Sequence, residues 1–354
     1  MGYVIRIKPK PIQPFVFVLA PLASFALAFL IGGVLMLWAG VDPISGYSAF
    51  LQGSLTTFPG LMQTLIQATL FMLMGTGIAI SNRAGVLNVG AEGQYIIGAI
   101  LATYIAISYQ QVLSPQLTLL LAMLAAMLGG ALWAMIAGLL KGFMNVNEVV
   151  STVILNWLAY RILQWIIRGP LRLPGPQLYP MSPPIATTLP VIEPSSGLNA
   201  GLMIALALAI FSYYLLFYTK AGFEIRVTGS NPELAKYAGF NVSKVIVLSM
   251  AYSGALAGIA GGVEVLGNLH YLFEGISIGL GYTSIIVSLV ARDHPLGVIA
   301  ASIMFGTIYS GSSFLQTATH LTYTFSKALE GLIYLFVLVT TLFAFYEIKL
   351  VKVK

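Results

Sequence analysis

Polar side chains that could do chemistry are concentrated in two stretches of this chain, residues 81–94 (SNRAGVLNVGAEGQ) and residues 147–157 (NEVVSTVILNW). Both border or enter long apolar runs. The side chains of interest are Asn88, Glu92, Gln94, Glu148, Ser151, Thr152, Asn156 and Trp157. Amides and hydroxyls exchange hydrogen bonds with a neutral polar solute, and an aromatic face packs against a sugar or a base. These residues are therefore candidates for lining a solute pathway.

The sequence does not have the pattern of a catalytic or metal centre. The three histidines, His270, His294 and His320, lie in separate loops or at the ends of apolar runs, and there is no cysteine. No Walker A sequence GxxxxGK[ST] occurs, so we do not expect the chain itself to bind ATP. We expect no catalytic residue, bound cofactor or metal in this chain.

Composition determines the elements that must position these residues. Hydrophobic residues make up 58% of the 354 residues and charged residues only 8%, whereas a soluble domain carries about a quarter charged residues. The chain is therefore predicted to be an all-α polytopic membrane protein of the cell membrane, with residues 1–354 forming a single integral domain.

A membrane-spanning helix needs about 20 apolar residues, and ten stretches are candidates. They are residues 15–38, 61–80, 89–107, 117–140, 149–167, 201–218, 245–266, 275–291, 295–315 and 328–345. Whether 275–291 crosses the membrane fully is left open. If both termini are cytoplasmic, only four of the 17 Lys and Arg residues lie on the extracytoplasmic side or inside a span. They are Arg161, Arg168, Arg172 and Lys327. This distribution follows the positive-inside rule.

Two loops stand out. Residues 168–198 contain eight prolines and are expected on the extracytoplasmic side, as a stiff connector or as a docking surface. Residues 219–244 form the longest cytoplasmic loop. In it, Asn231, Pro232 and Glu233 predict the start of a helix of about two turns, and Gly239 predicts its end.

Residues 81–94 are predicted to be a break between two helices. Non-helical backbone at membrane depth is tolerated only where it is buried in protein or lines a cavity. Asn88 can satisfy freed backbone groups there. Glu92 has two possible roles, a structural cap near the N-terminus of the following helix or a contact with solute. Arg83 is an inside anchor or a partner for a carboxylate. The clustered glycines Gly254, Gly258, Gly261 and Gly262 predict close helix packing.

Four motifs occur together: GVLNVGAEGQ, NEVVST followed by Leu155-Asn156, GSNPELAKYAGF, and ARDHPLG. Together they resemble the permease subunits of ATP-binding-cassette importers, in the branch that moves nucleosides and simple sugars. The resemblance covers residues 61–311.

This resemblance implies a core of two permeases with ten helices each, resting on ATPase subunits that hold ATP and Mg. It also implies an extracytoplasmic solute-binding protein. Whether the second permease is identical or only related stays open. The loop 219–244 would couple to the ATPase, with the contact at Gly229, Asn231, Ala235, Tyr237 and Gly239.

The resemblance indicates a nucleoside as the solute, with a simple sugar or oligosaccharide as the alternative. A different class, the ion-coupled secondary transporter, would need carboxylates near mid-membrane, where these spans are almost free of them. A purely structural scaffold would explain none of the motifs.

Overall fold

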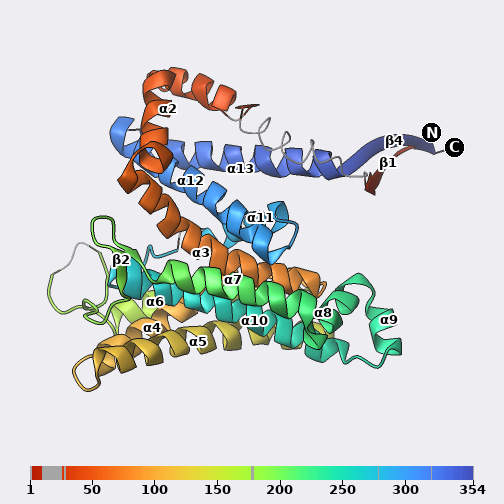
Figure 1. The fold of residues 1–354 in the computed structure, drawn as a ribbon, viewed down its shortest axis with the longest axis horizontal. Helices are drawn as coiled ribbons and strands as arrows, with labels where there is room; N and C mark the ends of the chain where they lie inside the picture. The colour runs from red at the N-terminus through yellow and green to blue at the C-terminus, as the bar shows by residue number, and fades with distance from the viewer. Residues whose placement is uncertain are drawn as a thin grey trace. The chain divides into compact units, whose positions relative to one another are not determined.

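The computed structural model describes residues 2–9, 26–27, 29–176, 179–277, 279–319 and 321–353. Most of these residues are helical (Figure 1). The α-helices are α2 (Pro43–Leu51), α3 (Phe58–Arg83), α4 (Ala91–Tyr109), α5 (Pro115–Met144), α6 (Glu148–Arg168), α7 (Gly201–Tyr218), α8 (Lys220–Ser230), α9 (Pro232–Tyr237), α10 (Val242–Val263), α11 (Leu280–Val290), α12 (Pro295–Thr319) and α13 (Tyr323–Phe345). Two π-helical segments, η1 (Gln52–Thr56) and η2 (Glu264–Leu269), follow α2 and α10.

Seven helices within the described residues are long and apolar enough to cross a membrane. They are α3, α4, α5, α6, α7, α10 with η2, and α12, and each coincides with a predicted span. The predicted span 328–345 lies within α13, which has 23 residues. Of the predicted span 15–38, residues 15–25 and 28 lie outside the described residues, and Phe29–Trp38 is helical. The total of ten spans stays a prediction.

The stretch 275–291 forms only the short helix α11, which has 11 residues. At 1.5 Å per residue it is about 16 Å long, about half of a hydrocarbon core of about 30 Å. The residues that precede it, 270–277, are not helical. α11 alone is therefore too short to span a membrane.

The chain divides into two compact units, which we describe separately: residues 62–306, and residues 1–61 with 307–354. In the larger unit, α10 packs against α5 and α4 along faces of small residues. A Cβ added to Gly98 would lie 2.4 Å from the Cα of Gly258, and one added to Gly130 would lie 2.1 Å from the carbonyl oxygen of Gly254. The helix backbones thus touch directly, which confirms the close packing predicted from the glycines of α10.

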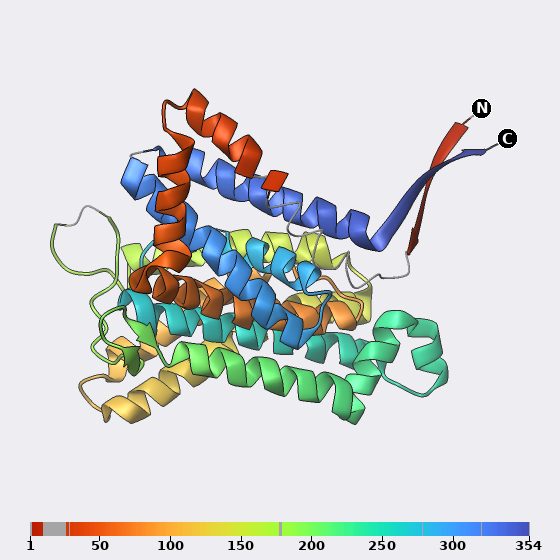
Figure 2. The same ribbon diagram turned by 45° about the horizontal axis from the view of Figure 1, so that its top comes forward.

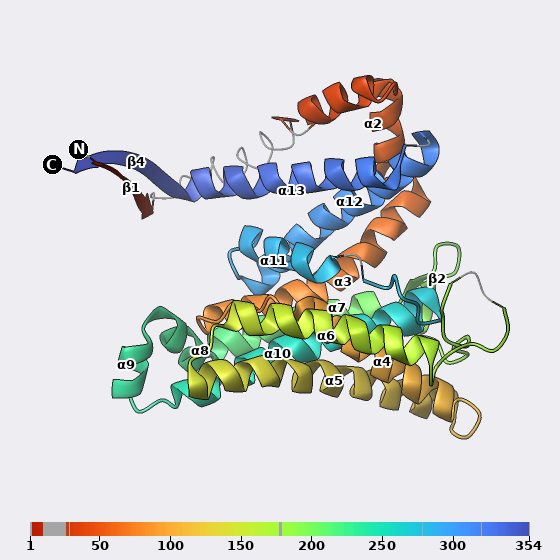
Figure 3. The same ribbon diagram turned by 180° about the vertical axis from the view of Figure 1, so that it is seen from behind.

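The Pro-rich loop is attached to the larger unit by backbone hydrogen bonds. The amide N–H groups of Ser182, Ile185 and Leu189 donate to carbonyl oxygens of Leu272, His270 and Leu266, at 2.8 Å in each case. The strands β2 (Val191–Glu193) and β3 (Leu198–Asn199) then pair antiparallel. The loop lies at one end of the helices, and α8 and α9 lie at the opposite end (Figures 1 and 3).

The smaller unit contains α2, η1, α13 and the second part of α12. Ser310 Oγ of α12 donates to the carbonyl oxygen of Gly53 at 2.6 Å, and in α13 Lys327 Nζ lies 2.7 Å from Glu330 Oε2. The terminal strands β1 (Gly2–Pro9) and β4 (Tyr346–Val353) pair antiparallel. The two chain ends therefore lie side by side (Figure 2). The sequence did not predict these small sheets, and they add to an otherwise helical fold.

Candidate functional site

The break between α3 and α4 consists of residues 84–90. Gly85 has a φ of +78°, a conformation that costs glycine no steric strain, so the chain turns sharply after α3. Asn88 then satisfies the freed backbone, because its Oδ1 accepts from Gly90 N–H at 2.9 Å. This role of Asn88 was predicted. Its Nδ2 donates to Gln94 Oε1 and to Ser253 Oγ of α10, both at 2.8 Å.

Asn156 of α6 holds the break from the other side. Its Oδ1 accepts from Gly93 N–H at 2.8 Å, and its Nδ2 donates to the carbonyl oxygen of Val89 at 2.9 Å. The same Nδ2 lies 3.1 Å from the hydroxyl of Tyr282 on α11. Three helices, α4, α6 and α11, therefore meet at this one amide.

Glu92 caps a helix, but the helix is α11 rather than its own α4. One carboxylate oxygen accepts from Gly279 N–H at 2.9 Å and from the hydroxyl of Ser277. The other accepts from Gly281 N–H at 2.7 Å. An anion is stabilised at the positive end of a helix dipole. The side chain is buried, and both of its carboxylate oxygens accept hydrogen bonds at the start of α11.

The other predicted residues on α6 lie at its first turns. Glu148 forms an ion pair with Lys141 of α5 at 3.0 Å. The hydroxyls of Ser151 and Thr152 donate back to the carbonyl oxygen of Glu148, at 3.1 and 2.6 Å. Both hydroxyl-bearing residues are buried, and their hydroxyls are satisfied within α6.

Two aromatic side chains beside this network remain open. Trp157 is 63% exposed and Tyr282 is 42% exposed. The sequence predicted Trp157 as a candidate but missed Tyr282, which lies in a stretch with no local pattern of polar spacing. Asn156 bonds to the hydroxyl of Tyr282, so the buried amide network supports this exposed ring, and Trp157 is the next residue along α6.

The loop 219–244 folds as α8 and α9. Asn231 caps α9, because its Oδ1 accepts from Leu234 N–H at 3.0 Å, and Gly239 follows with a φ of +82°. The predicted start and end of this helix are therefore confirmed. Ala235 is fully buried within the chain, whereas Tyr237 is 90% exposed and Leu234 is 56% exposed. The sequence did not single out Leu234.

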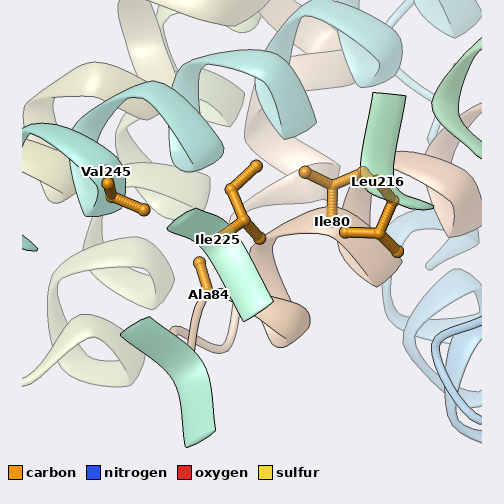
Figure 4. Packing of buried hydrophobic residues seen from close by; sticks show 5 residues of the cluster. All are labelled: Ile80, Ala84, Leu216, Ile225 and Val245. Carbon is orange, nitrogen blue, oxygen red and sulfur yellow. The ribbon is translucent and has the colours of Figure 1, made fainter. Parts of the chain in front are cut away.

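α8 packs on the end of α3. A Cβ on Gly229 would lie 2.1 Å from the carbonyl oxygen of Arg83 and 2.9 Å from Gly85 N. Beside this contact, Ile225 of α8 packs in one apolar cluster with Ile80 and Ala84. Leu216 of α7 and Val245 of α10 complete the cluster (Figure 4).

Arg83 and Asn82 hold the turn between α11 and α12. Arg83 donates from Nε to the carbonyl oxygen of Asp293 at 3.0 Å and from Nη2 to that of Arg292 at 2.9 Å. Asn82 Nδ2 donates to Asp293 Oδ1 at 2.7 Å. Burial raises the pKa of Asp293, and the bonds from Asn82 and Ser288 oppose that rise. Arg83 thus anchors this turn through carbonyl oxygens, and its charge also acts on the carboxylate of Asp293. Its role as an anchor on the cytoplasmic side stays a prediction.

His294 is part of the same turn. Its Nδ1 lies 3.3 Å from Gly297 N–H, at the start of α12. Its ring lies beside those of Tyr213 and Phe217 on α7, with centroids 5.5 and 5.3 Å apart. Burial, and then the charge of Arg83, lower the pKa of His294, which favours the neutral ring whose Nδ1 can accept.

Residues 60–342 match the family model described as "Branched-chain amino acid transport system / permease component". The chain belongs to this permease family. It is a multi-pass protein of the plasma membrane and a permease component of an ATP-binding-cassette transport system. Among the residues that the structure describes, no group of three or more His, Asp or Glu side chains could hold a metal ion.

Three relatives show how far the similarity extends along the permease. The glucose ABC transporter permease protein TsgB13 of Haloferax volcanii is 29% identical over 93% of this chain and 89% of its own length. The guanosine ABC transporter permease protein NupP of Bacillus subtilis is 31% identical, over 83% of this chain and 85% of its own. The nucleoside ABC transporter permease protein NupB of Lactococcus lactis is 27% identical, over 83% and 84%.

Proposed function

We propose that this permease forms the translocation pathway for a neutral polar solute, a nucleoside, in an ATP-driven importer. The observation that carries the proposal is the chemistry around the break. The buried groups there are amides, hydroxyls and the Glu92 carboxylate, whose two oxygens accept hydrogen bonds at the start of α11, and the exposed groups are the aromatic rings of Trp157 and Tyr282. Such rings pack against the base and sugar of a nucleoside.

A neutral solute is favoured because the cations beside the break are already engaged. Arg83 donates to two carbonyl oxygens, and Lys141 is paired with Glu148. A phosphorylated solute would need free cationic donors to replace its hydration. The relatives named for guanosine, for nucleosides and for glucose all move solutes without a phosphate, which supports the same class here.

A simple sugar or oligosaccharide is the second candidate, because the relative named for glucose matches 93% of this chain. We favour a nucleoside because Tyr282, which bonds to Asn156, and Trp157 on α6 both carry exposed rings. The eight residues Asn88, Glu92, Gln94, Glu148, Ser151, Thr152, Asn156 and Trp157 are proposed to form the wall of the pathway. In our proposal Trp157 and Tyr282 touch the solute, and the buried members hold the wall in shape.

We further propose that α9 docks on an ATPase subunit, which holds ATP and Mg and performs hydrolysis, so that this chain is not itself an enzyme. The exposed side chains of Leu234 and Tyr237 lie three residues apart on α9, on one face. This pair offers an apolar contact, whereas Ala235 faces its own chain. Gly229, Asn231 and Gly239 shape the loop that presents them.

The remaining partners follow from the family. A second permease, identical or related, would complete the pathway, and an extracytoplasmic solute-binding protein would deliver the solute near the Pro-rich loop 168–198. Both termini are proposed to be cytoplasmic with ten spans between them. The pairing of β1 with β4 supports one side for both ends, and the positions of α8–α9 and the Pro-rich loop at opposite ends of the helices support opposite sides for these loops.

The test of the solute class is uptake by the reconstituted importer, with its ATPase, second permease and solute-binding protein. Labelled uridine, adenosine, uridine monophosphate and glucose are compared. We expect uptake of the nucleosides and none of the monophosphate. Uptake of glucose alone selects the sugar alternative, and preference for the monophosphate refutes a neutral solute.

A further inference from the structure

The short helix α11 is held at both of its ends by one segment, residues 82–92, which we name the α3–α4 link. At the N-terminal end, Glu92 of the link accepts from Gly279 N–H and Gly281 N–H at 2.9 and 2.7 Å. Beyond the C-terminal end, Arg83 of the link donates to the carbonyl oxygens of Arg292 and Asp293. The position of α11 therefore depends on the shape of the link.

The turn that follows α11 has an unusual backbone conformation. Arg292 and Asp293 are not glycines, yet their φ angles are +56° and +52°. This left-handed conformation costs about 1–2 kcal/mol per residue, and it persists only where surrounding contacts enforce it. The donors of Arg83 and Asn82 are such contacts. The turn is also bonded to the end of α11, from Arg292 N–H to Leu289 O at 3.0 Å and from Asp293 N–H to Ser288 O at 2.9 Å, so the turn and α11 form one unit that the link holds.

The loop α8–α9 touches the link directly. Gly229 at the end of α8 and Gly85 of the link meet backbone to backbone, since a Cβ on Gly85 would lie 3.1 Å from the Cα of Gly229. A side chain on Gly229 would collide with the carbonyl carbon and oxygen of Arg83. No flexible side chain lies between the two backbones that could absorb a small displacement of α8.

We propose that the α3–α4 link transmits displacement of α8–α9 to α11, and so moves Tyr282 relative to Asn156 in the pathway. Arg83 and Glu92 are the positioning residues of this device. The proposal rests on the proposed function, in which α9 docks on an ATPase. In this proposal α11, which is too short to cross the membrane, is the part of the pathway wall that moves.

The experiment follows α11 directly. The chain has no cysteine, so Leu289→Cys introduces a single thiol on α11, at a side chain that is 40% exposed. In the assembled importer, the rate of maleimide labelling is measured without nucleotide and with ATP plus vanadate. The measurement is repeated with Gly229→Ala. The matched control is Gly222→Ala in the same helix, where the three atoms nearest to an added Cβ belong to Leu215 and Leu216 of α7, the first being the carbonyl oxygen of Leu215 at 2.1 Å.

We expect labelling to change several-fold with nucleotide in the parent, to change as much with Gly222→Ala, and to stay constant with Gly229→Ala in complexes that contain the ATPase. An unchanged response with Gly229→Ala, an equal loss in both variants, or no response in the parent overturns the proposal. If Gly229→Ala does not assemble, Arg83→Lys serves instead, because lysine cannot donate to both carbonyl oxygens in the same planar geometry. The nucleotide-dependent change in labelling must then be lost in the Arg83→Lys variant.

A failed docking of α9 is recognised separately. If α9 is not the ATPase contact, Leu234→Glu leaves assembly with the ATPase intact. That result refutes the proposed docking. The role of the link is tested separately, by the labelling of Leu289→Cys in assembled complexes that hydrolyse ATP.

Discussion

Asn156 on α6 and Gly93 on α4 are joined by a hydrogen bond of 2.8 Å from the glycine N–H to the asparagine Oδ1. The same asparagine donates to the carbonyl oxygen of Val89, two residues before α4 begins. One side chain of α6 therefore satisfies backbone groups on both sides of the start of α4. The break in the membrane helix is possible because these groups are paired.

Asn156→Leu should therefore destabilise the permease as well as slow transport. The substitution leaves a buried N–H and a buried carbonyl oxygen without this partner, and an unsatisfied buried group costs about 1–3 kcal/mol. We expect a lower thermal unfolding temperature in detergent and slower uptake. Trp157→Leu is the control, since its side chain is exposed and forms no hydrogen bond in the network; it should slow uptake and leave the unfolding temperature unchanged. Equal unfolding temperatures for both variants would contradict the role of Asn156.

The exposed face of α9 should be needed for assembly with the ATPase. Leu234→Glu places a charge in the proposed apolar contact, and we expect the variant to reach the membrane but to co-purify with far less ATPase. Lys236→Ala is the control, because that side chain is exposed and pairs only with Glu233 at 3.3 Å. Ala235 is not part of this exposed face, since it is buried in its own chain. ATPase recovery equal to the parent with Leu234→Glu would exclude this face.

The local helix of this loop could be predicted because its signals are adjacent in sequence. Asn231 and Pro232 define the start of α9, and Gly239 its end, through backbone rules that need no tertiary contact. The role of Glu92 could be predicted only in part. A carboxylate in the first turn indicates a cap, but the helix that it caps begins 188 residues later.

Contacts between residues far apart in the chain could not be predicted from the sequence. Nothing near Tyr282 indicates that its hydroxyl meets Asn156, and nothing near Arg83 indicates carbonyl oxygens of the turn after α11. Hydrophobic length predicted seven spans well, because it depends on composition alone. The same criterion could not show that α11 covers only residues 280–290 of the predicted span, since hydropathy does not report whether the backbone is helical.

The stability of the permease should fall as the pH drops below about 6.5, through His294. Its pKa is lowered in the folded chain from the ordinary value of 6.5, so the unfolded chain binds the proton more readily and acid favours unfolding. Protonation also removes the Nδ1 lone pair that faces Gly297 N–H. His294→Asn keeps an acceptor and should weaken this dependence. Asp293, with its raised pKa, acts in the opposite direction at lower pH, so the comparison uses pH 5.5–7.5. An identical dependence of stability on pH in the parent and in His294→Asn would refute this role of His294.

The orientation can be tested with single thiols in this cysteine-free chain. Lys236→Cys in α9 should react only with maleimides that enter the cell. Ser195→Cys, at an exposed position in the Pro-rich loop, should react with impermeant ones. The opposite labelling would reverse the topology and place α9 on the wrong side for an ATPase.

ATP-driven import through this chain is measured most directly as uptake of labelled uridine into proteoliposomes that contain the complete importer. Each preparation is compared with one whose ATPase subunit binds ATP but cannot hydrolyse it. We predict accumulation of uridine above the external concentration only with the active ATPase, and its reduction by Trp157→Leu in this permease. Accumulation that persists with the inactive ATPase, or that follows an imposed ion gradient, would contradict the account.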